Sequence, residues 1–225
     1  MLHDWRIEPR EYERHESRRG RRFAFETIDP RRTALVVVDM VPFFLEENAY
    51  ARGIVSNIRA LAAMLRSRGG QVVWVLPATR EPTRAMTEFF GPTVAATYAA
   101  SAGSGPLSAR LWHEFTPEDG DLLVEKSSAG AFFPGRCDLH ALLTERDVDT
   151  VLVTGTVANV CCESTARDAS TMGYRVIMVA DANAALRDED LTATLHTIYR
   201  SFGDVRPTSD ILTMIESALA AEPIP

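Results

Sequence analysis

The sequence predicts an α/β protein in which a mainly parallel sheet of six strands lies between two layers of helices. From residue 33 onwards, short apolar runs rich in β-branched residues alternate with segments of helical periodicity. This alternation favours parallel strands joined by helical crossovers, as in Rossmann-like folds. No linker rich in Pro, Gly or Ser divides the chain, and no internal repeat is present. We therefore expect a single three-layer α/β/α domain over residues 33–225.

The expected strands are the apolar runs, which read as buried parallel strands because they show no polar alternation. They cover residues 34–38, 71–76, 122–124, 150–154, 175–180 and 204–206. The expected helices carry apolar residues three and four positions apart, and two of them are followed by glycine. They cover residues 53–68, 93–100, 138–146, 161–172, 188–201 and 209–220. Residues 77–120 are otherwise irregular.

Residues 1–32 differ from the rest of the chain and form a charged N-terminal arm. The arm contains the basic run 18–22, but Glu8, Glu11, Glu13 and Glu16 are interspersed among its arginines. This mixture favours a solvated segment packed over the domain or a neighbouring subunit, rather than a basic arm for an anionic partner.

Composition narrows the classes of function. The 225 residues carry a net charge of −7, which argues against a general nucleic-acid binder. No apolar run approaches the roughly 20 residues that span a bilayer, and the first residues lack a signal core. The three cysteines have no metal-site spacing, so we expect reduced thiols, a cytoplasmic location, and neither membrane partner nor cofactor. Lys126 is the single lysine beside 23 arginines.

Three reactive side chains follow three of the expected strands. Asp39 follows the first strand, Lys126 the third, and Cys161 the turn after the fourth. The carboxyl ends of parallel strands meet at one edge, so the three are expected to converge. A cation and a helix start would favour a thiolate at Cys161, and Asp39 could move protons. Each residue also has a structural explanation: a core cysteine, a turn aspartate and a surface lysine.

At these segments the sequence resembles the isochorismatase-like cysteine hydrolases. The matching segments are 35–40, 124–126, 153–169 and 173–182, and the most specific motif is Gly155-x-x-x-Asn159-x-Cys161-x-x-x-Thr165-x-x-Asp168-Ala169. The resemblance implies the isochorismatase-like fold, with Cys161 as nucleophile, Asp39 as proton-transfer group and Lys126 as third member. It also implies a cis Thr156–Val157 peptide and an oxyanion hole formed by the N–H groups of Val157 and Cys161. Cys162 matches an apolar position and is expected in the core.

The sequence departs from the family pattern in three ways. Ala158 replaces a threonine that is usual before the Asn-x-Cys stretch, and Val41-Pro42-Phe43 replaces a polar stretch after Asp39. No histidine lies between His15 and His113, so the metal site of nicotinamidases is not expected.

The resemblance implies hydrolysis of a C–N bond through a thioester. The expected substrate is a small amide, ureide or lactam, with a streptothricin-type cyclic amide as one candidate. Candidate substrate-binding residues are Phe43, Phe44, Phe132, Phe133 and Arg80. A homo-oligomer, dimer or tetramer, is also implied. Two alternatives remain open: isochorismate-type vinyl-ether hydrolysis with an idle cysteine, and a non-catalytic binding module.

Overall fold

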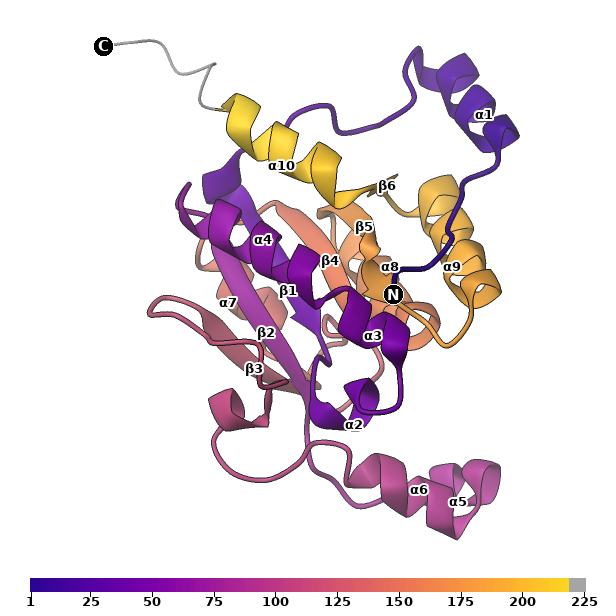
Figure 1. Ribbon diagram of the computed structural model, residues 1–225, viewed down its shortest axis with the longest axis vertical. Coiled ribbons are helices and arrows are strands. Elements are labelled where there is room, and N and C mark those ends of the chain that lie inside the picture. Colours follow the sequence, from indigo (N-terminus) through magenta and orange to yellow (C-terminus); the bar gives the residue numbers. More distant parts are fainter. Residues whose placement is uncertain (219–225) are drawn as a thin grey trace.

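Six parallel strands form one sheet in the computed structural model, which describes residues 1–218 (Figure 1). The strands are β1 (Thr33–Val38), β2 (Gln71–Pro77), β3 (Leu122–Lys126), β4 (Thr150–Thr156), β5 (Arg175–Ala184) and β6 (Asp204–Arg206). Their order is β3-β2-β1-β4-β5-β6, and every neighbouring pair is parallel. The chain thus builds the sheet outward from β1 in one direction and then outward from β4 in the other. The predicted α/β architecture is confirmed.

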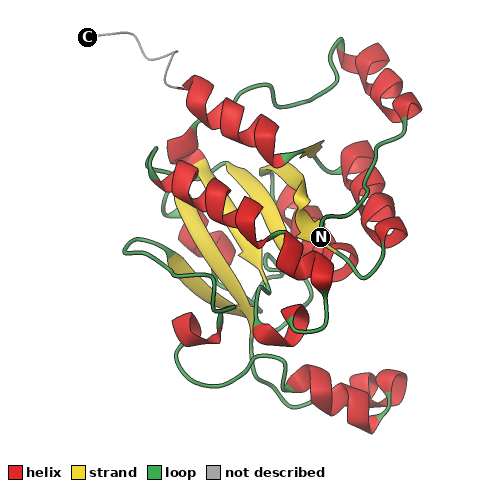
Figure 2. Ribbon diagram, in the orientation of Figure 1, coloured by secondary structure: helices red, strands yellow, loops and turns green. Residues whose placement is uncertain are grey.

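Helices cover both faces of the sheet (Figure 2). The helices are α1 (Pro9–Arg19), α2 (Pro42–Leu45), α3 (Ala49–Gly53), α4 (Val55–Arg66), α5 (Arg84–Phe90), α6 (Pro92–Ala99), α7 (Leu139–Thr144), α8 (Glu163–Thr171), α9 (Asp188–Ser201) and α10 (Thr208–Ser217). Three short turns of helix are η1 (Pro30–Arg32), η2 (Leu107–Arg110) and η3 (Ala158–Cys162). Helices α3, α4 and α10 pack on one face, and α7, α8 and α9 pack on the other.

The continuous apolar runs are explained by this two-sided burial. Along β1, Val36 and Val38 pack with the α7–α9 layer, whereas Leu35 and Val37 pack with the α4–α10 layer. All six residues of β1 are buried. Each fully buried Val or Leu side chain contributes about 1.5–3 kcal/mol, so the central strands anchor the carboxyl edge firmly.

Several predicted helices have different bounds in the structure. The helix expected over 53–68 is α4, which covers Val55–Arg66, and a separate short helix that was not expected, α3, precedes it. Asn48 caps α3, since its Oδ1 atom accepts hydrogen bonds from the N–H groups of Tyr50 and Ala51. Helix α5 was not expected, whereas α6 agrees with the predicted segment 93–100. Helix α10 ends at Ser217, and residues 219–220 of the predicted last helix lie outside the described residues.

Strand β5 is longer than the apolar run predicts. Its pairing with β4 shifts register between Val153 and Gly155, which lets the strand continue to Ala184. The buried side chain of Asn183 stabilises the shift, since Nδ2 donates hydrogen bonds to the carbonyl groups of Val153 and Val179. A polar residue inside a strand carries no apolar signal, so the periodicity misses this extension.

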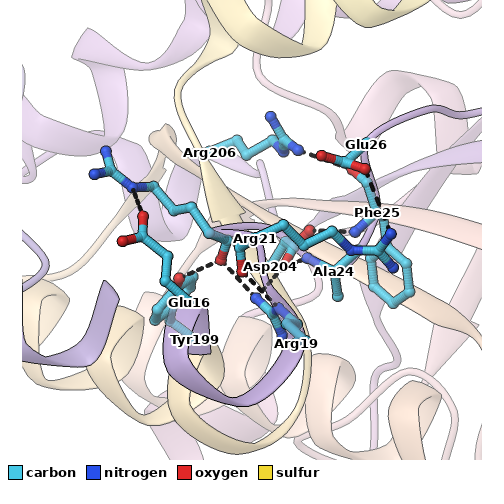
Figure 3. A network of polar contacts seen from close by, with 10 residues as sticks. Glu16, Arg19, Arg21, Ala24, Phe25, Glu26, Tyr199, Asp204 and Arg206 are labelled. Atoms are coloured by element: carbon cyan, nitrogen blue, oxygen red, sulfur yellow. Dashed lines mark hydrogen bonds and ion pairs between the residues drawn. The ribbon is translucent and has the colours of Figure 1, made fainter. Parts of the chain in front are cut away.

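The N-terminal arm packs against its own domain. The buried carboxylate of Asp204 in β6 accepts hydrogen bonds from the backbone N–H groups of Ala24 and Phe25, both 2.8 Å long (Figure 3). Arg206 lies over the ring of Phe23, and Tyr199 of α9 donates a hydrogen bond to the carbonyl of Arg22. These contacts agree with a packed arm, while the boundary at residue 32 remains a prediction. Within residues 1–218, no helix is both long enough and apolar enough to cross a membrane.

Candidate active site

The three predicted catalytic side chains meet at the carboxyl edge of the sheet. Asp39 directly follows β1, Lys126 is the last residue of β3, and Cys161 lies in η3, five residues after β4 ends. Strands β1 and β4 are neighbours, and the strand order reverses between them. Open α/β sheets bind ligands at this reversal.

Lys126 lies within contact distance of both other side chains. Its Nζ atom is 2.8 Å from Oδ2 of Asp39 and 3.5 Å from Sγ of Cys161, and it donates a hydrogen bond to the Ser128 carbonyl at 3.1 Å. The exposed fractions of Asp39, Lys126 and Cys161 are 1%, 4% and 9%. Oδ2 of Asp39 is paired with the Lys126 ammonium, whereas Oδ1 has no hydrogen-bond partner within residues 1–218. A buried carboxylate oxygen without a partner costs free energy, which favours a chemical role over a structural one.

The backbone around Asp39 is shaped by close approach of β1 and β4. Asp39 has a positive φ of 52°, a conformation that costs about 1–3 kcal/mol for residues other than glycine. The N–H of Asp39 donates to the Val75 carbonyl at 2.8 Å, which holds the strained turn in place. Gly155, opposite, has a φ of 114°, and a Cβ atom there would lie 2.1 Å from the Val38 carbonyl oxygen. Only glycine fits at this motif position.

Cys161 lies in a wide turn rather than at the start of an α-helix. The N–H of Cys162 bonds the Val157 carbonyl five residues back, as in a π-helix, and α8 begins only at Glu163. The Thr156–Val157 peptide at the base of this turn is cis. The backbone N–H of Val157 lies near enough to the Cys161 sulfur to lower the pKa of the thiol. Cys162 is fully buried in the core, where the sequence places it.

Thr165 contributes to the site, although the sequence analysis gave it no role of its own. Its hydroxyl donates to the Cys161 carbonyl at 2.7 Å and accepts the N–H of Ala131 at 3.1 Å. It therefore joins the cysteine turn to the loop after Lys126. The spacing of four residues from Cys161 on a helical turn, where threonine hydroxyls reach back to a carbonyl, was the available signal.

Replacing Thr165 with valine is expected to lower turnover about tenfold and stability by about 1–3 kcal/mol, because the buried Ala131 N–H loses its partner. Thr165→Ser keeps the hydroxyl and is the matched control. Steady-state rates and thermal unfolding of both variants check this. Unchanged turnover in Thr165→Val, or losses of equal size in the two variants, would contradict a specific role for the hydroxyl.

The electrostatics of the site favour a neutral thiol in the resting protein. Burial and the nearby Asp39 carboxylate raise the pKa of Cys161 to about 12, although Lys126 and the Val157 N–H act in the opposite direction. Burial also raises the pKa of Asp39, against the lowering effect of Lys126. For Lys126, burial is outweighed by Asp39 and Cys161, so its pKa is raised and it stays charged. These directions favour a neutral resting thiol, in contrast to the thiolate that a cation and a helix start would favour at Cys161.

The predicted substrate-binding residues differ in their exposure to solvent. Phe43 is exposed on α2, where its ring contacts Phe44 and Tyr98, and Phe133 is 52% exposed on the loop after β3. Arg80 donates a hydrogen bond to the carbonyl of Ser127, next to Lys126.

For Phe132, the structure does not agree with the predicted substrate-binding role. Only 1% of the residue is exposed, and its ring packs against Tyr174, so it belongs to the core rather than to an open pocket wall. Neighbouring aromatic residues alternate in direction on this loop, which the sequence alone does not reveal.

Across residues 1–218, no three His, Cys, Asp or Glu side chains are grouped to hold a metal ion.

Comparison with known families agrees with this geometry. The family model described as "Isochorismatase domain" matches residues 33–210. The chain belongs to the isochorismatase family. The matched region contains the sheet and all three converging side chains, and it leaves the N-terminal arm outside.

Several members of the isochorismatase family are similar over most of their length. The uncharacterized isochorismatase family protein YwoC of Bacillus subtilis is 33% identical, covering 84% of this chain and 97% of YwoC. The ureidoacrylate amidohydrolase RutB of Rhizobium rhizogenes is 26% identical, covering 87% of this chain and 88% of RutB. The crystal structure of a cysteine hydrolase from Pseudomonas syringae pv. phaseolicola superimposes with a TM-score of 0.76 at 31% identity, covering 87% and 97% of the two chains.

Proposed function

We propose that this protein is a cysteine-dependent amidohydrolase that cleaves a C–N bond in a small amide, ureide or lactam. The observation that carries the proposal is the position of Lys126 Nζ, 2.8 Å from the Asp39 carboxylate and 3.5 Å from the Cys161 sulfur. A nucleophile, a proton carrier and a fixed cation are the components that acyl transfer requires. The names of two relatives, an amidohydrolase and a cysteine hydrolase, support the same chemistry.

The first half-reaction begins from the neutral thiol. Asp39 takes the proton of Cys161 as the sulfur attacks the substrate carbonyl, so the thiolate forms only during attack. The N–H groups of Val157 and Cys161 are proposed to bind the tetrahedral oxyanion. The protonated Asp39 then donates its proton to the departing nitrogen, the C–N bond breaks, and a thioester remains on Cys161.

The second half-reaction restores the site. Ionised Asp39 removes a proton from a water molecule as its oxygen attacks the thioester carbonyl. The second tetrahedral intermediate collapses with the sulfur as leaving group, the acid is released, and the proton held by Asp39 returns to Cys161. Throughout, Lys126 keeps Asp39 in place and offsets its charge, because the ammonium remains protonated.

We propose the substrate class from side chains on the segments that follow Asp39 and Lys126, and from Arg80. Phe43 and Phe133 present exposed apolar rings from the segments after Asp39 and Lys126, and Arg80 provides a cation beside Ser127. This combination suits a small ureide or amide that carries an acidic group, and the ureidoacrylate amidohydrolase relative supports it. A streptothricin-type lactam is the second candidate within the same reaction class.

The proposal also includes a cellular location and an oligomeric state. All three cysteines are free thiols, which suits a reducing cytoplasm, and the acidic net charge offers nothing for nucleic acid. Helix α5 has no buried side chain and exposes 82% of Phe89, which suits a homo-oligomer, dimer or tetramer.

The proposal is tested with a panel of ureides, amides and lactams, assayed for release of ammonia or amine. We expect turnover of at least one compound, and an acyl adduct on Cys161 after acid quench during the steady state, located by peptide mass mapping. An adduct on Cys137, or turnover with no trapped adduct at any quench time, would contradict the cysteine mechanism. Turnover of vinyl ethers alone would favour the isochorismate-type reaction, and no turnover at all the binding module.

A further inference from the structure

His3, in the N-terminal arm, is a buried histidine with both ring nitrogens occupied. Only 8% of the residue is exposed. Its Nδ1 atom lies 2.6 Å from Oδ1 of Asp188, and its Nε2 atom accepts the backbone N–H of Ala185 at 3.1 Å. The ring stacks on Tyr50 with centroids 3.6 Å apart. Because Nε2 accepts, the ring proton is on Nδ1 and is donated to Asp188.

The residue that His3 holds is directly connected to the cysteine turn. Ala185 follows the last residue of β5, Ala184, which pairs with Thr156 of β4. The Thr156 hydroxyl donates to the Ala184 carbonyl at 3.3 Å, and Asn48 donates to the Ala185 carbonyl at 3.1 Å. Thr156 immediately precedes Val157, whose backbone N–H lies near enough to the Cys161 sulfur to lower the pKa of the thiol. One strand pairing therefore separates His3 from the proposed oxyanion hole.

The first residues of the chain are seated closely against the domain beside α3 (Figure 1). A Cβ atom on Gly53 would lie 1.8 Å from the Met1 carbonyl oxygen, so the chain passes α3 at backbone contact distance. Ile7 is buried in the core on the α7–α9 face. Residues 1–7 thus form a strap from the core to the end of β5.

The arm is held against the domain at a second place, apart from the strap. A second, separate set of contacts attaches it at β6 and α9, where Asp204 binds Ala24 and Phe25 and where Tyr199 binds Arg22 (Figure 3). His15 also packs there, with its ring centroid 5.0 Å from that of Tyr199. His3 instead contacts Ala185, at the end of β5 beside the cysteine turn.

We infer that His3 is a positioning residue for the proposed reaction: the strap of residues 1–7 fixes Ala184–Ala185, and through them the Thr156–Val157 backbone that lines the reacting carbonyl. The inference rests on the proposed function only for its effect on rate. The strap lies outside residues 33–210, which the family model matches.

The test compares three variants of the full-length protein: His3→Ala, His3→Gln and His15→Ala. His3→Ala removes the acceptor for Ala185, whereas the glutamine carbonyl restores one. His15→Ala removes a buried arm histidine at the other attachment and controls for loss of arm packing. Hydrogen–deuterium exchange of peptides covering 155–162 and 183–187 is measured together with kcat, KM and thermal unfolding.

We expect faster exchange in both peptides for His3→Ala, little change for His15→Ala, and recovery in His3→Gln. With a substrate identified, kcat of His3→Ala falls about tenfold while KM changes less than about twofold, since the oxyanion contact forms only during reaction. Unchanged exchange over 155–162 in His3→Ala, or an equal change in His15→Ala, would overturn the inference. Hydrogen exchange is measured without substrate and therefore does not depend on the proposed function. If the exchange changes as expected but the protein shows no amidase activity, the proposed function is rejected and the positioning of Thr156–Val157 by the strap is supported.

Discussion

Replacing Cys161 with alanine is expected to lower amide hydrolysis by about 10⁴-fold or more, a loss of at least about 5 kcal/mol of transition-state stabilisation. The sulfur forms the covalent bond in the proposed mechanism, and no other thiol can replace it. Cys162 is fully buried with its sulfur against the Thr154 carbonyl, and Cys137 is half-buried in the loop that follows β3. Steady-state kinetics on the best compound of the panel measure the loss.

The same variant separates the two chemical alternatives. Vinyl-ether hydrolysis needs an acid at Asp39, whose pKa is raised by burial, and leaves the cysteine idle, so it would survive the substitution. Cys137→Ala is the matched control, because it removes a half-buried thiol outside the triad. Amide hydrolysis retained in Cys161→Ala would refute the covalent mechanism, whatever the control shows.

The sheet could be predicted from the sequence because two-sided burial leaves a clear signal. The run at 34–38 is apolar at every position, and the run at 150–154 is apolar except for the threonines at its two ends, as expected for strands buried on both faces. The extension of β5 could not be predicted, because it depends on hydrogen bonds of Asn183 to two carbonyl groups across a register shift. Helix α5 was missed for another reason: it buries no side chain and therefore has no apolar periodicity.

The members of the site could be predicted, but their protonation could not. Topology brings the ends of β1, β3 and β4 together, so polar residues after these strands are identifiable as candidates. Whether Cys161 is a thiol or a thiolate depends on the balance between burial, a carboxylate and an ammonium at distances that no sequence contains. Burial and the Asp39 carboxylate act more strongly on the pKa of Cys161 than Lys126 does.

If the resting cysteine is a neutral thiol, Lys126 has a different role from the one that it would have beside a resting thiolate. With a neutral thiol, the ammonium has no resting thiolate to stabilise, and its nearest partner is the carboxylate of Asp39 at 2.8 Å. Its effect on Cys161 becomes important only when the proton has moved to Asp39 and the sulfur is negative. Lys126 therefore serves first to keep a buried carboxylate ionised and then to stabilise the sulfur anion during attack.

Replacing Lys126 tests both tasks, and the two informative variants differ in shape and charge. Lys126→Arg keeps the charge but introduces a broad planar group where a compact ammonium fits among Asp39, Cys161 and the Ser128 carbonyl. We expect turnover to fall about 10³-fold while the protein still folds. Lys126→Met keeps the length and removes the charge, so it should lose turnover to a similar extent.

The pH dependence distinguishes the charge effect from simple misfit. Asp39 must be ionised to accept the thiol proton, so kcat/KM should rise as pH increases through the pKa of Asp39. In Lys126→Met the lowering effect of the ammonium is gone and burial acts unopposed, so the pKa of Asp39 rises and the acid limb moves to higher pH. In Lys126→Arg the charge remains and the limb should move less. Circular dichroism establishes folding, and near-normal turnover in either variant, or an unmoved limb in Lys126→Met, would show that this lysine is structural.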